Sequence, residues 1–141
     1  MKREFCTYEQ ALALKELGFN EPCFGTYGYN GEEKSTYFPL EYICKKEEYE
    51  LEPFDIRNSN IGDDVSAPLK QQVFRWLLIK HNLYGIIIPT VTMHWTFKTM
   101  TVVEGMVEAP PYNHVDANDY STYEEAESAC IDKLIEIVKN K

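Results

Sequence analysis

The segment from Ser66 to Lys80, SAPLKQQVFRWLLIK, constrains the fold most, because it predicts a helix that is apolar around most of its circumference. Its main face consists of apolar residues spaced i, i+4, i+7 and i+8, namely Leu69, Val73, Trp76 and Leu77. Phe74, Leu78 and Ile79 widen that face. A helix of this kind is usually covered on more than one side, so we expect it at the centre of the fold.

The ends of this helix carry recognisable signals. Ser66 is the expected N-cap, because its hydroxyl can accept from a free amide in the first turn. Asn82 is the expected left-handed stop. A narrow polar strip near the start is predicted to face water, and it consists of Lys70, Gln71, Gln72 and Arg75.

A first, shorter helix of about three turns is predicted after Thr7, which forms a capping box with Gln10. Gly18 suits the left-handed position after its last turn, and Phe19 can fold back as in a Schellman ending. This helix is therefore bounded by signals at both ends.

The closing helix is the clearest element of the sequence. Ser121 or Thr122 caps it, and Glu124 and Glu125 favour its positive N-terminal end. Its apolar stripe is regular and consists of Ala126, Cys130, Ile131, Leu134, Ile135 and Val138. We expect this stripe to dock on a sheet or on the central helix.

Two hairpins are predicted. Residues 23–29 and 33–38 flank Asn30-Gly31, a strong signal for a type I′ turn. Residues 84–88 and 93–103 form the second pair, joined through 89–92, and the later run alternates between two faces.

The elements run in the order α-β-β-loop-α-β-β-α. This order predicts an α+β fold in which an antiparallel sheet from two hairpins packs against three helices. We expect one domain over residues 1–141, with long irregular connections at 39–65 and 104–120. Residues 39–65 are interpreted as local disorder or a family insertion, with a binding loop as the alternative.

Charge limits the possible partners. Fourteen Lys and Arg against 23 Asp and Glu give a net charge of −9, which opposes direct binding to nucleic acid or anionic membranes. The longest apolar region, residues 83–103, contains Pro89, His94 and Lys98, so it is too polar to cross a bilayer. The sequence does not predict an oligomeric state.

The four cysteines, Cys6, Cys23, Cys44 and Cys130, fit no zinc spacing. The N-terminal residues lead into a helix signal and have no signal-peptide pattern. We therefore expect free thiols and a cytoplasmic protein without a cofactor.

Catalytic chemistry has one weak candidate. His114 and Asp116 lie two residues apart with Asp119 nearby, and together they could hold a divalent metal for hydrolysis. No second ligand cluster or phosphate-binding glycine loop accompanies them. A small metal-dependent hydrolase is thus the alternative to a protein that is not an enzyme.

The preferred hypothesis is a small acidic accessory protein that binds a protein partner. Aromatic side chains of the first hairpin are the candidate binding surface: Phe24, Tyr27, Tyr29 and Tyr37. The same residues could instead form core. A variant of this hypothesis is an acidic mimic that occupies the nucleic-acid groove of another protein.

Three segments carry a resemblance: CTYEQALALKELGF, APLKQQVFRWL and STYEEAESACIDKLIEIVK. They are similar to a group of short open reading frames in phages and prophages of gut anaerobic bacteria. The resemblance spans the start, middle and end of the chain, and it implies a small soluble protein of mobile-element origin. Under the binding hypothesis, the candidate partner is a host or phage protein. It implies no catalytic or binding residues.

Overall fold

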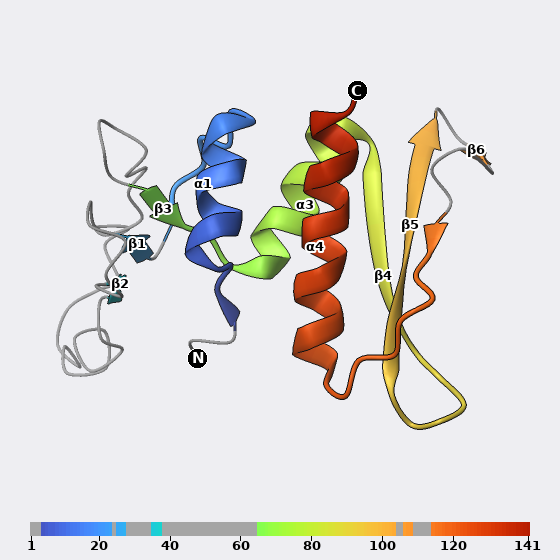
Figure 1. Cartoon of the computed structure of the whole chain (residues 1–141). Coiled ribbons are helices and arrows are strands. Elements are labelled where there is room, and N and C mark those ends of the chain that lie inside the picture. The colour runs from blue at the N-terminus through green and yellow to red at the C-terminus, as the bar shows by residue number, and fades with distance from the viewer. Residues whose placement is uncertain (1–3, 24, 28–34, 38–64, 104–105, 109–113) are drawn as a thin grey trace, which may run out of the picture. The chain divides into compact units, whose positions relative to one another are not determined.

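The fold is α+β, with helices and antiparallel strands, as the sequence predicts. The structure is a computed structural model, and it describes residues 4–23, 25–27, 35–37, 65–103, 106–108 and 114–141 (Figure 1). Contacts divide the chain into an N-terminal unit, residues 5–69, and a C-terminal unit, residues 1–4 and 70–141. Among the described residues, the N-terminal unit contains one helix and the C-terminal unit contains two, and each unit has its own strands.

In the N-terminal unit, helix α1 (Tyr8–Glu16) begins and ends as predicted. The Gln10 amide donates to Thr7 Oγ1 over 3.2 Å, and the Thr7 amide donates to Gln10 Oε1 over 3.1 Å. Gly18 has a φ of 87°, and the Phe19 amide donates to the Leu14 carbonyl over 2.9 Å. This is the Schellman pattern.

The N-terminal sheet has the strand order β2-β1-β3. Strands β1 (Gly25–Tyr27) and β2 (Ser35–Tyr37) form the predicted antiparallel pair, while Asn30-Gly31 lies outside the described residues. Strand β3 (Val65–Ala67) pairs with the other side of β1. The prediction that Ser66 caps a helix is wrong, because Ser66 is a buried residue of β3.

In the C-terminal unit, helix α3 (Lys70–His81) therefore starts four residues later than Ser66. Val73, Trp76 and Leu77 are buried as predicted, and Asn82 has the left-handed φ of 55°. Ile79, predicted to widen the apolar face, is 62% exposed, so this helix is covered on fewer sides than its composition indicates.

The C-terminal sheet is built on the second predicted hairpin. Strands β4 (Leu83–Pro89) and β5 (Trp95–Val103) are antiparallel, with Leu83 opposite Thr101. Strands β6 (Met106–Glu108) and β7 (His114–Val115) also pair with β5. The sequence predicted only an irregular connection there. The two hairpins belong to separate sheets, so the prediction of one shared sheet is wrong.

Helix α4 (Tyr123–Lys139) has Thr122 as its cap and a capping box with Glu125. Its predicted stripe is buried from Ala126 to Ile135, and it packs against β4 and β5. Gly85 permits the close approach: a Cβ there would lie 2.6 Å from Cys130 Sγ and 2.8 Å from the Phe74 ring.

Candidate partner-binding surface

Of the aromatic surface predicted from the sequence, the structure describes one side chain, that of Tyr27. Its hydroxyl donates to the Cys6 carbonyl, and its ring packs edge-to-face on Tyr8 with centroids 5.5 Å apart. The half-buried Tyr27 thus contributes to packing within its unit. Phe24 and Tyr29 lie outside the described residues, as does the Tyr37 side chain, so this surface stays a prediction.

The three residues of the metal hypothesis are near one another in sequence, but the two described carboxylates have different partners. Asp116 accepts from the Tyr120 hydroxyl over 2.6 Å and from the Asn118 amide over 3.2 Å. Asp119 accepts from Thr92 Oγ1 over 3.1 Å. His114 lies in β7, and its side chain is outside the described residues.

Elsewhere too, the described part of the chain holds no group of three His, Cys, Asp or Glu side chains that could bind a metal. Cys130 is fully buried, and burial, with the nearby charges of Glu127 and Asp116, raises the pKa of its thiol to about 12. A thiol with that pKa is protonated at neutral pH and is a poor nucleophile. Cys6 and Cys23 are also buried.

A different surface stands out at the turn between β4 and β5, the hairpin tip (Thr90–His94). Val91 is fully exposed and Met93 is 90% exposed. The Thr90 amide donates to the His94 carbonyl over 2.9 Å, and the Met93 amide donates to the Thr90 carbonyl over 3.2 Å. Met93 has a φ of 63°, the left-handed position that glycine or asparagine usually occupies in such a turn.

The side chains around the turn hold it in place. Asp119 accepts from Thr92, which also lies 2.8 Å from the Thr90 hydroxyl. The same carboxylate lies 3.7 Å from His94 Nδ1. These contacts fix the turn while leaving Val91 and Met93 in solvent.

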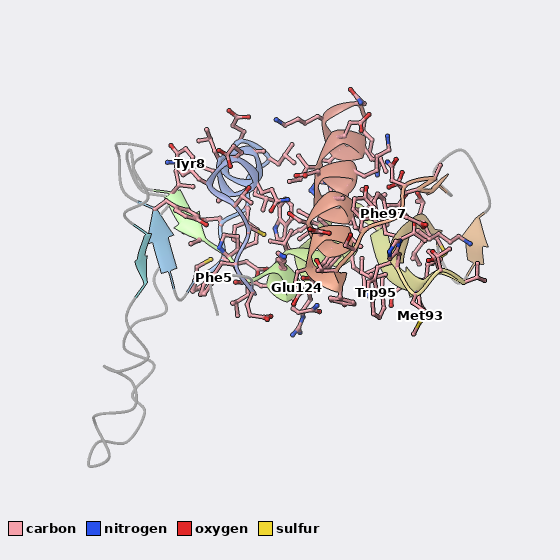
Figure 2. The ribbon with its side chains drawn as sticks, turned by 60° about the horizontal axis from the view of Figure 1, so that its bottom comes forward. Phe5, Tyr8, Met93, Trp95, Phe97 and Glu124 are labelled. Atoms are coloured by element: carbon pink, nitrogen blue, oxygen red, sulfur yellow. The ribbon has the colours of Figure 1, made fainter. Side chains whose placement is uncertain are left out.

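Two aromatic side chains extend the apolar area towards α4. The Trp95 and Tyr123 rings pack edge-to-face with centroids 5.3 Å apart, and Tyr123 is 39% exposed. The Trp95 and Tyr120 backbones exchange two hydrogen bonds of 2.8 Å, which join the strand to the segment before the helix. Figure 2 shows Met93 pointing away from the ribbon near Trp95. We call Val91, Met93, Trp95 and Tyr123 the tip surface.

Acidic side chains flank the tip surface. Asp119 contacts the turn directly, and Glu124 and Glu125 lie in the first turn of α4, beside Tyr123. Asp119 and Glu125 are exposed, so their charges face solvent. The surface thus combines exposed apolar side chains with a negative border.

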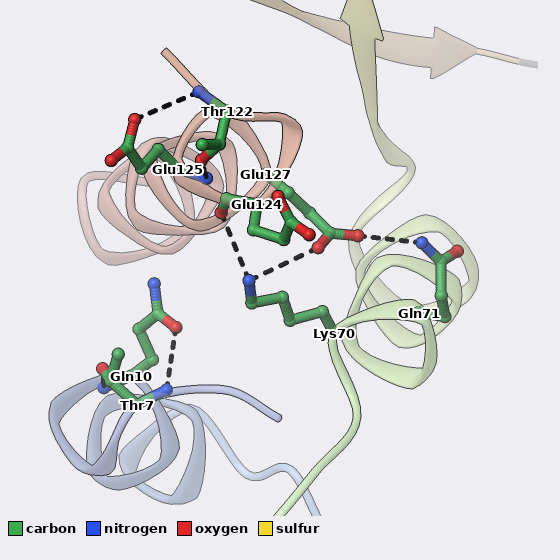
Figure 3. A network of polar contacts seen from close by, with 8 residues as sticks. All are labelled: Thr7, Gln10, Lys70, Gln71, Thr122, Glu124, Glu125 and Glu127. Carbon is green, nitrogen blue, oxygen red and sulfur yellow. Dashed lines mark hydrogen bonds and ion pairs between the residues drawn. The ribbon is translucent and has the colours of Figure 1, made fainter. Parts of the chain in front are cut away.

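Behind this surface, a buried ion pair joins the starts of α3 and α4 (Figure 3). Lys70 Nζ lies 3.4 Å from Glu127 Oε2 and donates to the Glu124 carbonyl over 3.2 Å. Gln71 donates to Glu127 Oε1 over 2.9 Å. The prediction that Lys70 faces water is wrong: it is 5% exposed, because a partner 57 residues away satisfies its charge.

His81 also differs from expectation. Its imidazole lies at the end of α3, where a positive charge is ordinarily favourable, but burial and the charge of Lys141 lower its pKa. Its Nε2 atom is buried without a hydrogen-bond partner. The neutral imidazole is therefore the favoured form.

The tip surface was not predicted from the sequence, although the sequence contains a signal for it. The segment between the two strands, PTVTMH, has the apolar residues Val91 and Met93 where the turn must be, and a tight turn cannot bury both side chains.

No helix among the described residues is long and apolar enough to span a membrane. No protein-family model, curated protein or solved structure matches the chain.

Proposed function

We propose that this chain is a small accessory protein without enzymatic activity, and that it binds a basic protein partner through the tip surface. The observation that carries the proposal is the full exposure of Val91 and Met93 on a turn that neighbouring side chains hold in place. Apolar side chains exposed together on a rigid support are typical of interaction sites.

The conformation of Met93 supports the same proposal. A left-handed φ costs a residue other than glycine about 1–2 kcal/mol, and Asn is among the few side chains that tolerate it well. Met93 has a φ of 63° and buries almost none of its side chain. Because folding gains nothing evident from a methionine here, we attribute this residue to binding. Methionine is also enriched at protein interfaces.

The charge around the tip indicates the kind of partner. Asp119, Glu124 and Glu125 border the apolar residues, and the whole chain has a charge of −9. A basic protein with an apolar recess complements both features. Nucleic acid and anionic membranes are disfavoured as direct partners by the same charges.

The origin of the partner follows from the resemblance to phage and prophage reading frames. If the chain is of mobile-element type, its partner is a host or phage protein. An acidic mimic of nucleic acid is a narrower form of this proposal, in which the basic partner is itself a nucleic-acid-binding protein.

The test is affinity capture from bacterial lysate with the full chain and two variants. The tip variant combines Val91→Ser and Met93→Asn. The control is Leu12→Ser, which removes a 38% exposed apolar side chain from α1. We expect basic proteins to be recovered at low salt by the original chain and by the control, and to be lost with the tip variant.

Thermal melting of each variant shows that loss of recovery is not loss of folding. Equal recovery by the tip variant and the original chain would contradict the proposal. Repeating the capture with Tyr29→Ala tests the surface predicted on the first hairpin, because loss of recovery there would move the binding site to that hairpin.

A further inference from the structure

Strand β4 has an open edge. It pairs with β5 along one side, and no strand among the described residues pairs with its other side. An unpaired edge presents backbone donors and acceptors that can pair with another chain. Natural proteins usually protect such an edge with charged residues, and β4, with the sequence LYGIIIP, has none.

The hydrogen bonds at both ends of the hairpin identify the groups that face the open edge. The Thr90 amide donates to His94, and the Val102 amide donates to Asn82. In an antiparallel pair, bonded positions alternate, so Tyr84, Ile86 and Ile88 exchange bonds with β5. The backbone groups of Leu83, Gly85 and Ile87 consequently point away from β5, as does the Pro89 carbonyl. Leu83 is fully buried, so the accessible part of the edge begins at Gly85. Pro89 has no amide hydrogen to offer.

The open edge is accessible at its middle. Gly85 is partly exposed, and because glycine has no side chain, that exposure belongs to its main chain. Tyr84, on the face of the sheet opposite to Gly85, is 42% exposed. A partner strand could therefore reach the backbone of Gly85 and cover Tyr84.

Charge is distributed unequally between the two ends of β4. At the hairpin tip lie Asp119, Glu124 and Glu125, which we call the acidic end. At the other end the helices α3 and α4 finish, and Lys141 Nζ donates to the His81 carbonyl over 3.1 Å. Figure 1 shows the C-terminus of α4 near the start of β4 and its N-terminus near the tip. The exposed side chains of Lys80, Lys139 and Lys141 form this basic end.

We propose that β4 pairs antiparallel with β4 of a second copy of the chain, across a two-fold axis at Ile87. Ile87 then faces Ile87 of the second copy and exchanges two backbone hydrogen bonds with it. The Gly85 amide donates to the Pro89 carbonyl of the second copy. This register needs no amide hydrogen from Pro89, and it places Ile86 beside Ile88 of the second copy.

A second copy fits this edge better than an unrelated strand because of the charges. Antiparallel pairing brings the acidic end of each copy beside the basic end of the other, so local attraction opposes the repulsion expected from a net charge of −9. The contact is isologous and closes as a dimer. Such pairing is independent of partner binding at the tip surface, so either property can be lost without the other.

Sedimentation of the full chain over a range of concentrations, together with amide hydrogen exchange, tests this pairing. We expect a monomer–dimer equilibrium, and slowed exchange of the Gly85 and Ile87 amides as the dimer forms. The Ile86 and Ile88 amides, which already bond to β5, should be protected in both states. A chain that stays monomeric, or a dimer in which the Gly85 and Ile87 amides exchange freely, would overturn the proposal.

Two variants test whether the open edge of β4, and not another part of the sheet, is responsible for dimerisation. Ile87→Pro removes an edge amide that β5 does not use, and Ile86→Lys introduces a charge next to Ile88 of the second copy. We expect each to raise the dimer dissociation constant by about tenfold or more. Val102→Lys, on the same face of β5 but away from the edge, is the control and should dimerise normally. Normal dimerisation of Ile86→Lys would also overturn the proposal.

Discussion

The two hairpins differ in where their prominent side chains lie. In the first, Tyr27 belongs to a strand paired on both sides, and its ring and hydroxyl are engaged within the N-terminal unit. In the second, Val91 and Met93 lie in a turn and contact solvent, although the sequence there is less aromatic. Residue type alone is thus a poor guide to a binding surface. Position in the sheet and turn geometry decide exposure.

The largest expected effect comes from the glycine in each hairpin. In Gly85→Ala the new Cβ would lie 2.6 Å from Cys130 Sγ and 2.8 Å from Phe74, so the helices must move. We expect the free energy of unfolding to fall by about 2–3 kcal/mol. In Gly25→Ala the nearest atom is Ala67 Cβ at 3.2 Å, and the loss should be below about 1 kcal/mol. Equal losses in urea unfolding would contradict this difference in packing.

The next test asks whether Tyr27 is part of the packing. Tyr27→Phe removes the hydroxyl that donates to Cys6, and we expect a loss of about 1 kcal/mol in chemical unfolding. Tyr84→Phe is the matched control, because Tyr84 is 42% exposed on its strand. It should leave stability unchanged. A Tyr27→Phe variant as stable as the original would show that the hydroxyl is dispensable, and that the first hairpin remains the better candidate surface.

At the second hairpin we expect a substitution to increase the free energy of unfolding instead of lowering it. Met93→Asn replaces an exposed methionine by a residue that tolerates a φ of 63°. We expect the free energy of unfolding to rise by about 0.5–1 kcal/mol, which would raise the melting temperature. A fall in stability would mean that Met93 contributes to folding, and would remove one support for its role in binding.

The smallest effect concerns pH. The pKa of His81 is lowered from 6.5 by burial and by Lys141, so the folded chain disfavours the proton. The contribution of His81 to stability is fully present above pH 6.5 and is lost as the pH falls through 6.5 towards the folded pKa. We expect His81→Gln to flatten the pH dependence of the free energy of unfolding between pH 7.5 and about 6. Unchanged pH dependence in His81→Gln would contradict this assignment.

Local signals in the sequence were reliable. The capping box at Thr7 and the left-handed residues Gly18 and Asn82 were predicted, and Thr122 was one of the two caps predicted for the closing helix. Each depends on atoms within a few residues of one another, so the short-range chemistry is sufficient.

The errors come from long-range contacts. Ser66 has good cap chemistry, but it pairs with Thr26 in the sheet. Lys70 was assigned to water as part of the polar strip of its helix, but Glu127 of α4 pairs with it in the interior. The edge of β4 and the tip surface likewise depend on which strands are neighbours, which the hydrophobic pattern does not specify.

A photo-crosslinking experiment tests the tip surface most directly. A photoreactive phenylalanine analogue is placed at Val91 in one protein and at Leu12 in another, and each full chain is irradiated in bacterial lysate. We predict that the probe at position 91 crosslinks a basic protein at low salt and loses it at high salt, while the probe at position 12 does not. The absence of a crosslink at position 91, or the same products from both positions, would contradict the proposed binding surface.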